Sequence, residues 1–74
     1  MSRLPAVTPK QVVNVLLQAG FEQLRQTGSH LHLRHPQTRR RTVVPMHNRD
    51  VPRGLLLAIL KQAGLTADQF RELL

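Results

Sequence analysis

Apolar residues near the N-terminus recur at helical spacing. This spacing puts five apolar side chains on one face of a helix: Val12, Val13, Leu16, Leu17 and Ala19. Thr8 can cap this helix, Pro9 suits its first position, and Gln11 completes a capping box. Gly20 ends it, because glycine adopts the left-handed conformation of a helix C-terminus without strain. The pattern therefore predicts a first helix between Thr8 and Gly20.

The middle of the chain instead alternates between polar and apolar residues. Residues 29–35 read Ser-His-Leu-His-Leu-Arg-His, a pattern typical of a half-buried strand. The alternation directs Leu31 and Leu33 to the core. It leaves on the opposite face the side chains of His30, His32 and Arg34. We place His35 on the core-facing side or in the turn that follows.

Two further segments complete a predicted three-stranded antiparallel meander. Residues 40–44 are rich in β-forming side chains and follow a turn at residues 36–38. Residues 21–26 are a weaker strand candidate, which a turn at Thr27-Gly28 joins to the histidine-bearing strand. Short turns of this kind connect antiparallel neighbours.

The second half of the chain returns to helical spacing. Pro52 opens a helix that ends at Gly64. The apolar face of this helix consists of Leu56, Ile59, Leu60 and Ala63. Thr66 and Gln69 form another capping box, which predicts a short last helix ending at Leu74.

The order of elements predicts an α+β fold. One helix precedes a three-stranded antiparallel sheet, a second helix follows it, and a short helix ends the chain. The 74 residues form one domain, 1–74, in which we expect residues 1–6 to be flexible. A chain this short has a thin core and little room for a deep pocket, so we expect no large cofactor.

The net charge points to a polyanionic partner. Eleven Lys and Arg residues face four Asp and Glu residues, which gives a formal charge of +7. Nine of the eleven are arginines, whose planar guanidinium binds phosphate through two hydrogen bonds. Nucleic acid is the leading partner, and the alternative is a basic surface that serves only solubility.

Two classes of protein are excluded or disfavoured by composition. The chain has no cysteine, which removes disulfides, thiolate chemistry and cysteine-based zinc sites. Its longest apolar run, residues 55–60, is too short to cross a membrane, and the N-terminus lacks the apolar run of a signal peptide. We expect a cytoplasmic protein.

The histidines are the candidates for chemistry, because imidazole exchanges a proton near neutral pH. His30 and His32 share the non-core strand face, about 6.6–7 Å apart by the strand rise. A neutral imidazole there can remove the proton of a ribose 2′-hydroxyl, and nearby arginines can stabilise the charge that grows on the phosphate. The alternative is that these are ordinary exposed histidines.

Two other chemistries are weaker. Ser29 and His30 cannot act as a nucleophile and its base, because adjacent strand residues point to opposite faces. His30 and His32 could bind a metal ion, but the sequence indicates no third ligand and no carboxylate nearby, so we predict no metal site.

A set of short motifs occurs in order along the chain: Gly20-Phe21 after the first helix, Gly28-Ser29-His30 at the start of a strand, Pro45-x-His47 after the third strand, Gly54 at the next helix, and Ile59-Leu60-Lys61. This ordered set resembles the HicA family of messenger-RNA-cleaving toxins. The matching features run from Lys10 to about Phe70. A Gly-Ser-His sequence alone is weak evidence for the family, but the whole set in this order is a specific signature of it.

The resemblance implies a fold like the double-stranded-RNA-binding domain and an endoribonuclease that requires no metal. It assigns the catalytic role to His30 and gives His47 as a possible second residue, the alternative for His47 being a loop residue that packs or caps a helix. It further implies a messenger-RNA substrate, a HicB-type antitoxin partner, and arrest of translation and growth. Leu55 stands where family members usually carry threonine.

We assign RNA contacts to Arg34, to the run Arg39, Arg40 and Arg41, and to Gly28 and Ser29 of the motif. The alternative for the arginine run is a solvated hairpin turn. Two other functions stay open: a non-catalytic RNA-binding module of the same fold, and an inactive or antitoxin-locked relic of a toxin. With no Tyr or Trp and two Phe, base stacking on aromatic rings must be minor.

Overall fold

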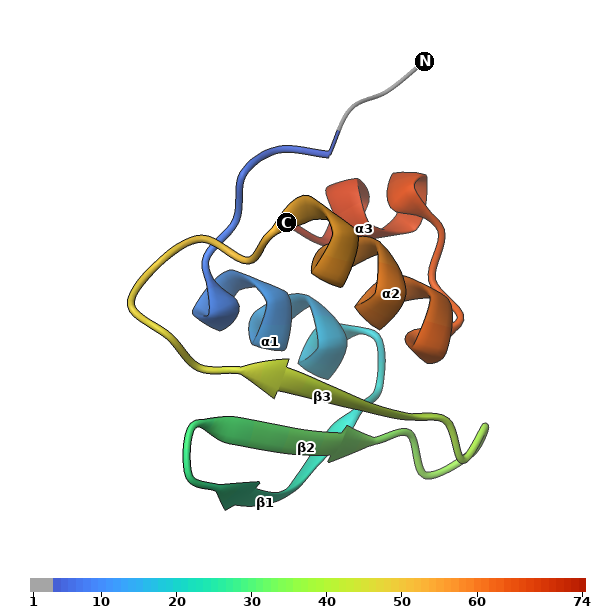
Figure 1. Cartoon of the computed structure of the whole chain (residues 1–74). Coiled ribbons are helices and arrows are strands. Elements are labelled where there is room, and N and C mark those ends of the chain that lie inside the picture. The colour runs from blue at the N-terminus through green and yellow to red at the C-terminus, as the bar shows by residue number, and fades with distance from the viewer. Residues whose placement is uncertain (1–3) are drawn as a thin grey trace.

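The first two helices pack on one face of a three-stranded antiparallel sheet, and the third packs on those two helices, in the computed structural model, which describes residues 4–74 (Figure 1). The elements in chain order are α1 (Pro9–Gln18), β1 (Glu22–Thr27), β2 (His30–Arg34), β3 (Arg41–Pro45), α2 (Arg53–Ala63) and α3 (Ala67–Leu73). The predicted α+β fold is confirmed. The sheet order is β1-β2-β3, so β2 is central and the two strands beside it form the edges.

Helix α1 begins and ends as its sequence predicts. The Thr8 hydroxyl accepts a hydrogen bond from the Gln11 backbone N–H, and the Gln11 side chain accepts one from the Thr8 N–H. At the other end Gly20 has a φ of 102°, and the Phe21 N–H donates to the Leu16 carbonyl at 2.9 Å. These bonds satisfy backbone groups that helix ends otherwise leave unpaired.

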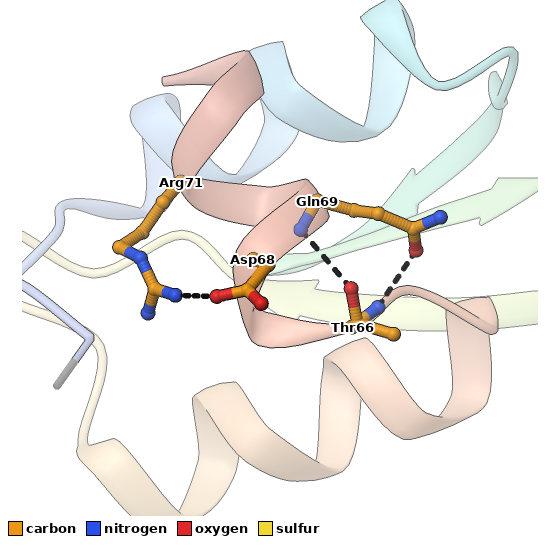
Figure 2. A network of polar contacts seen from close by, with 4 residues as sticks. All are labelled: Thr66, Asp68, Gln69 and Arg71. Atoms are coloured by element: carbon orange, nitrogen blue, oxygen red, sulfur yellow. Dashed lines mark hydrogen bonds and ion pairs between the residues drawn. The ribbon is translucent and has the colours of Figure 1, made fainter. Parts of the chain in front are cut away.

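Helix α3 is capped by the second predicted box, in which Thr66 and Gln69 bond reciprocally (Figure 2). Asp68 and Arg71 form an ion pair on the same helix. Phe70, fully buried, anchors α3 to the core. Gly64 ends α2 in the left-handed conformation, as predicted.

The element boundaries differ from the sequence prediction by one residue in several places. Strand β1 extends to Thr27, so the turn into β2 is formed by Gly28 and Ser29. Strand β3 covers 41–45 instead of 40–44. Pro52 is the N-cap of α2 and not its first helical residue. Of the segment expected to be flexible, residues 1–3 lie outside the described residues, and Leu4 packs half-buried against the core.

The core lies between the helices and the inner face of the sheet. Leu31 and Leu33 of β2 point into it, as the alternation predicts. The opposite face of the sheet has no helix over it among the described residues (Figure 1). Three side chains of β2 lie on that outer face: His30, His32 and Arg34. The predicted sorting of the β2 side chains is therefore confirmed.

His35 has a structural role at the end of β2. Its ring meets Phe21 edge-on, with centroids 5.3 Å apart. Its Nδ1 accepts hydrogen bonds from the backbone N–H groups of Gln37 and Thr38, which orders the turn between β2 and β3. The side chain is half-buried, on the core side of the turn as expected.

Candidate active site

The pairing of β2 with β3 fixes the position of His30. His30 lies opposite Pro45, the last residue of β3. One step beyond that pair, the Met46 N–H donates to the Ser29 carbonyl at 2.6 Å. Because β3 ends here, the exposed His30 side chain borders the point at which the chain leaves the sheet for α2. His47, also exposed, is the second residue of that departing loop.

The loop that carries His47 is tied to the start of α1. The Val51 N–H donates to the Val7 carbonyl at 2.8 Å, and both side chains are buried. This attachment brings the polar part of the loop beside Pro9, where His47, Arg49 and Asp50 border a common cleft. The loop that follows β3 passes next to the beginning of α1 in Figure 1.

The cleft has a volume of about 590 Å³ and runs between the β3 edge and α2. Its polar residues near the end of β3 are His30, His47, Arg49 and Asp50. Its apolar wall is formed mainly by Val43, Pro45, Leu55, Ala58 and Ile59. The sequence predicts a shallow, open active face, and the structure instead places His30 at a groove within the size range of small-molecule sites. Sequence alternation missed this groove because helix packing creates it.

The N-terminus of α2 opens at the same cleft. Its N-cap, Pro52, offers no side-chain hydrogen bond, and the first turn contains no acidic residue. The first N–H groups of a helix have no partner within the helix, and the helix dipole favours an anion there. Gly54 leaves this backbone open, since a Cβ at that position would meet no atom within 4 Å. Two imidazoles, a guanidinium and the Asp50 carboxylate thus line one cleft, together with Pro52, the N-cap residue of α2.

The family comparison matches this part of the chain. The family model described as the HicA toxin of bacterial toxin–antitoxin matches residues 9–65 of the 74. The chain belongs to the HicA toxin family. The matched range includes every residue that lines the cleft and ends before α3. Among curated proteins, none matches this chain. Membership of the HicA family implies a toxin role and an antitoxin partner.

Several of the HicA motif residues fall at the cleft or beside it, whereas Gly20 and Phe21 lie next to His35 at the other end of β2. His30 and His47, which the sequence predicts as catalytic and as a possible second residue, both line the cleft. Gly28 and Ser29 form the turn that leads into His30, and Gly28 has a φ of 60° with open space around it. Leu55, the departure from the usual HicA threonine, lies half-buried in the first turn of α2 and contributes to the apolar wall.

The predicted arginine contacts lie elsewhere on this HicA chain. Arg34 is four residues along β2 from His30, about 13 Å by the strand rise, and pairs across the sheet with Arg41. Arg39 is exposed in the turn, with a φ of 65°. Arg40 turns to α2 instead, where its Nη1 donates to the Gln62 carbonyl at 3.5 Å. None of these four arginines lines the cleft.

Two polar residues at the histidine end of the cleft and one residue opposite His32 were not predicted. Arg49 and Asp50 line the cleft because the loop is held to α1, a contact between distant segments. Arg25 lies opposite His32 on the outer sheet face because β1 has a bulge between Gln23 and Arg25. The short polar run just before Pro52 is the local signal that would have indicated Arg49 and Asp50, since loops before helix starts often carry function.

Among residues 4–74, no group of three His, Asp or Glu side chains is placed to hold a metal ion. No helix in this range is long and apolar enough to span a membrane.

Proposed function

We propose that this HicA-family chain is an endoribonuclease toxin that cleaves messenger RNA without a metal ion, in the cytoplasm. The observation that carries the proposal is the shared cleft of His30 and His47 at the open N-terminus of α2. Two imidazoles at one site supply a base and an acid, and the helix N-terminus supplies a place for phosphate. The net charge of +7 favours RNA binding in general.

The reaction follows from these groups. His30 accepts the proton of a ribose 2′-hydroxyl, and the 2′-oxygen attacks the adjacent phosphorus. The bond from phosphorus to the 5′-oxygen breaks, and that oxygen takes a proton from His47. The products are a 2′,3′-cyclic phosphate and a 5′-hydroxyl. Arg49 and the first N–H groups of α2 stabilise the negative charge on the phosphate oxygens during this step.

The antitoxin partner is, in this proposal, a HicB-type protein that occludes the cleft. The family supports an antitoxin, and the basic charge supports fast association with an acidic protein. Covering His30 and His47 would block RNA entry without any change in the fold.

The test compares variants of the purified chain on RNA in the presence of EDTA. His30→Ala should reduce cleavage by about 10²–10⁴-fold, the usual contribution of a general acid or base. His32→Ala is the matched control, because His32 lies on the same strand face but outside the cleft. This variant should cleave RNA at the wild-type rate. Circular dichroism should show both variants folded. RNA binding without cleavage by the wild-type chain would establish the non-catalytic alternative.

A further inference from the structure

The cleft extends well beyond the two histidines. Along β3 it runs from Pro45 back to Val43, about 7 Å by the strand rise, and along α2 it reaches Gln62. The histidine end is polar. The part toward Gln62 is walled by aliphatic side chains, among them Val43 and Ala58. A phosphate at the histidine end therefore leaves an apolar compartment unused.

Gln62 closes that compartment with a fixed amide. Its Oε1 accepts a hydrogen bond from the Thr42 hydroxyl at 2.8 Å. Thr42 is only 2% exposed, so its hydroxyl depends on this bond. The bond orients the amide and leaves the Nε2 group as a hydrogen-bond donor beside the cleft. An apolar wall with one oriented donor is the usual design of a selective binding site.

We propose that this compartment binds one unpaired base of the RNA substrate. The proposal rests on the cleavage function above, because it places the ribose and phosphate of the same nucleotide at His30 and His47. A carbonyl or ring-nitrogen acceptor of the base receives a hydrogen bond from Nε2 of Gln62. The base lies against aliphatic side chains because both phenylalanines, Phe21 and Phe70, are buried and cannot stack with it.

Base binding here has a consequence for the substrate. A base reaches a groove between a strand edge and a helix only when it is unstacked and turned out of a helix, which single-stranded RNA allows readily. The substrate is therefore single-stranded at the cleavage site, even though the sheet and helices resemble a duplex-binding fold. Gln62 and Ala58 become residues that determine where the RNA is cut.

Two substitutions test the compartment by changing the pattern of cut sites. Ala58 is exposed, so Ala58→Trp can fill the groove without disturbing the core. Gln62→Glu removes the Nε2 donor but still accepts the Thr42 hydrogen bond. Leu57→Trp, on an exposed α2 residue outside the cleft, and Gln37→Glu, in the turn before β3, are the matched controls. Sequencing the cut ends of a random RNA pool gives the preference of each protein.

The expected result is a redistributed set of cut sites in the two cleft variants. Relative rates among the four bases next to the cut should change by roughly 2–10-fold, the range of one hydrogen bond, while both controls keep the wild-type pattern. An unchanged pattern in folded, active cleft variants would overturn the compartment and leave the cleavage function intact. Absence of cleavage by the wild-type chain would instead reject the proposed function.

A binding measurement keeps the inference testable if a variant is inactive or unfolded. Methyl resonances of Ala58 and Val43 in the wild-type protein are followed by NMR while the four nucleoside 3′-monophosphates are added in turn. At least one nucleotide should shift them, and inorganic phosphate should not. Equal shifts with phosphate alone, or no shift with any nucleotide, would overturn the compartment.

Discussion

The Met46 N–H donates to the Ser29 carbonyl at 2.6 Å, and this bond joins the two residues that directly precede the histidines of the cleft. His30 follows Ser29 and His47 follows Met46. The Gly-Ser-His turn and the loop after β3 are thereby held together as one unit. Residues 17 positions apart thus border one site because β2 and β3 pair in this register.

His47→Ala should lower cleavage by about 10²-fold or more, because the leaving 5′-oxygen loses its proton donor. A matched substitution, His35→Ala, alters the turn instead of the cleft and should change stability but not the cleavage rate of the folded protein. A wild-type cleavage rate in folded His47→Ala would remove His47 from the mechanism.

The arginine run should divide into two kinds of residue. Replacing Arg39 and Arg41 with Gln should weaken RNA binding. It should also reduce the slope of the logarithm of the binding constant against the logarithm of salt concentration, by roughly 0.7 per lost phosphate contact for single strands. Arg40→Gln should leave the salt dependence nearly unchanged, because Arg40 lies at the C-terminus of α2. It should instead lower the free energy of unfolding by about 0.3–1 kcal/mol, the value of a cation at that end of a helix. The same loss of salt dependence in all variants would show that Arg40 also contacts phosphate.

Gly20→Ala should destabilise the fold by more than about 1 kcal/mol. The backbone at Gly20 has a φ of 102°, and a Cβ there would lie 2.7 Å from Nε2 of His35. Gly28→Ala is the control, because Gly28 has a φ of 60° but no atom within 4 Å of the added Cβ. Urea unfolding should therefore show a larger loss for Gly20→Ala. Equal losses would mean that the contact with His35 contributes nothing.

Much of the fold is predictable from the sequence because many of its elements are determined by residues close together in the chain. The two capping boxes and the glycines at helix ends are backbone hydrogen-bonding solutions that involve residues within a few positions. The β2 alternation likewise depends only on side-chain period. Strand β1 was a weak prediction for the opposite reason: all six of its residues are exposed, so no buried face marks it.

The site was predictable only in part. His30 was evident from its motif and strand face, and His47 from the family pattern. The cleft itself depends on the Val51–Val7 and Thr42–Gln62 hydrogen bonds, which join segments 44 and 20 positions apart. Local patterns carry no information about such contacts. The contact between Arg40 and α2 was not predictable for the same reason, because it follows from the packing of β3 against that helix.

An antitoxin bound over the cleft should protect His30 and His47 from diethyl pyrocarbonate. His35 serves as an internal reference, because its Nδ1 is already engaged within the turn in the free protein. Protection should be lost when excess RNA oligonucleotide competes for the same surface. Equal labelling of His30 and His47 in the free and bound protein would show that the antitoxin acts at another surface.

The most direct test of the central claim uses an RNA oligonucleotide with one strong cut site. A single 2′-deoxy substitution on the nucleotide 5′ to the cut removes the hydroxyl that His30 is proposed to deprotonate and changes nothing else. The account predicts that cleavage at this position stops, while the unmodified RNA yields a 2′,3′-cyclic phosphate and a 5′-hydroxyl in the presence of EDTA. Continued cleavage of the deoxy-substituted RNA, or a 3′-hydroxyl product, would contradict it.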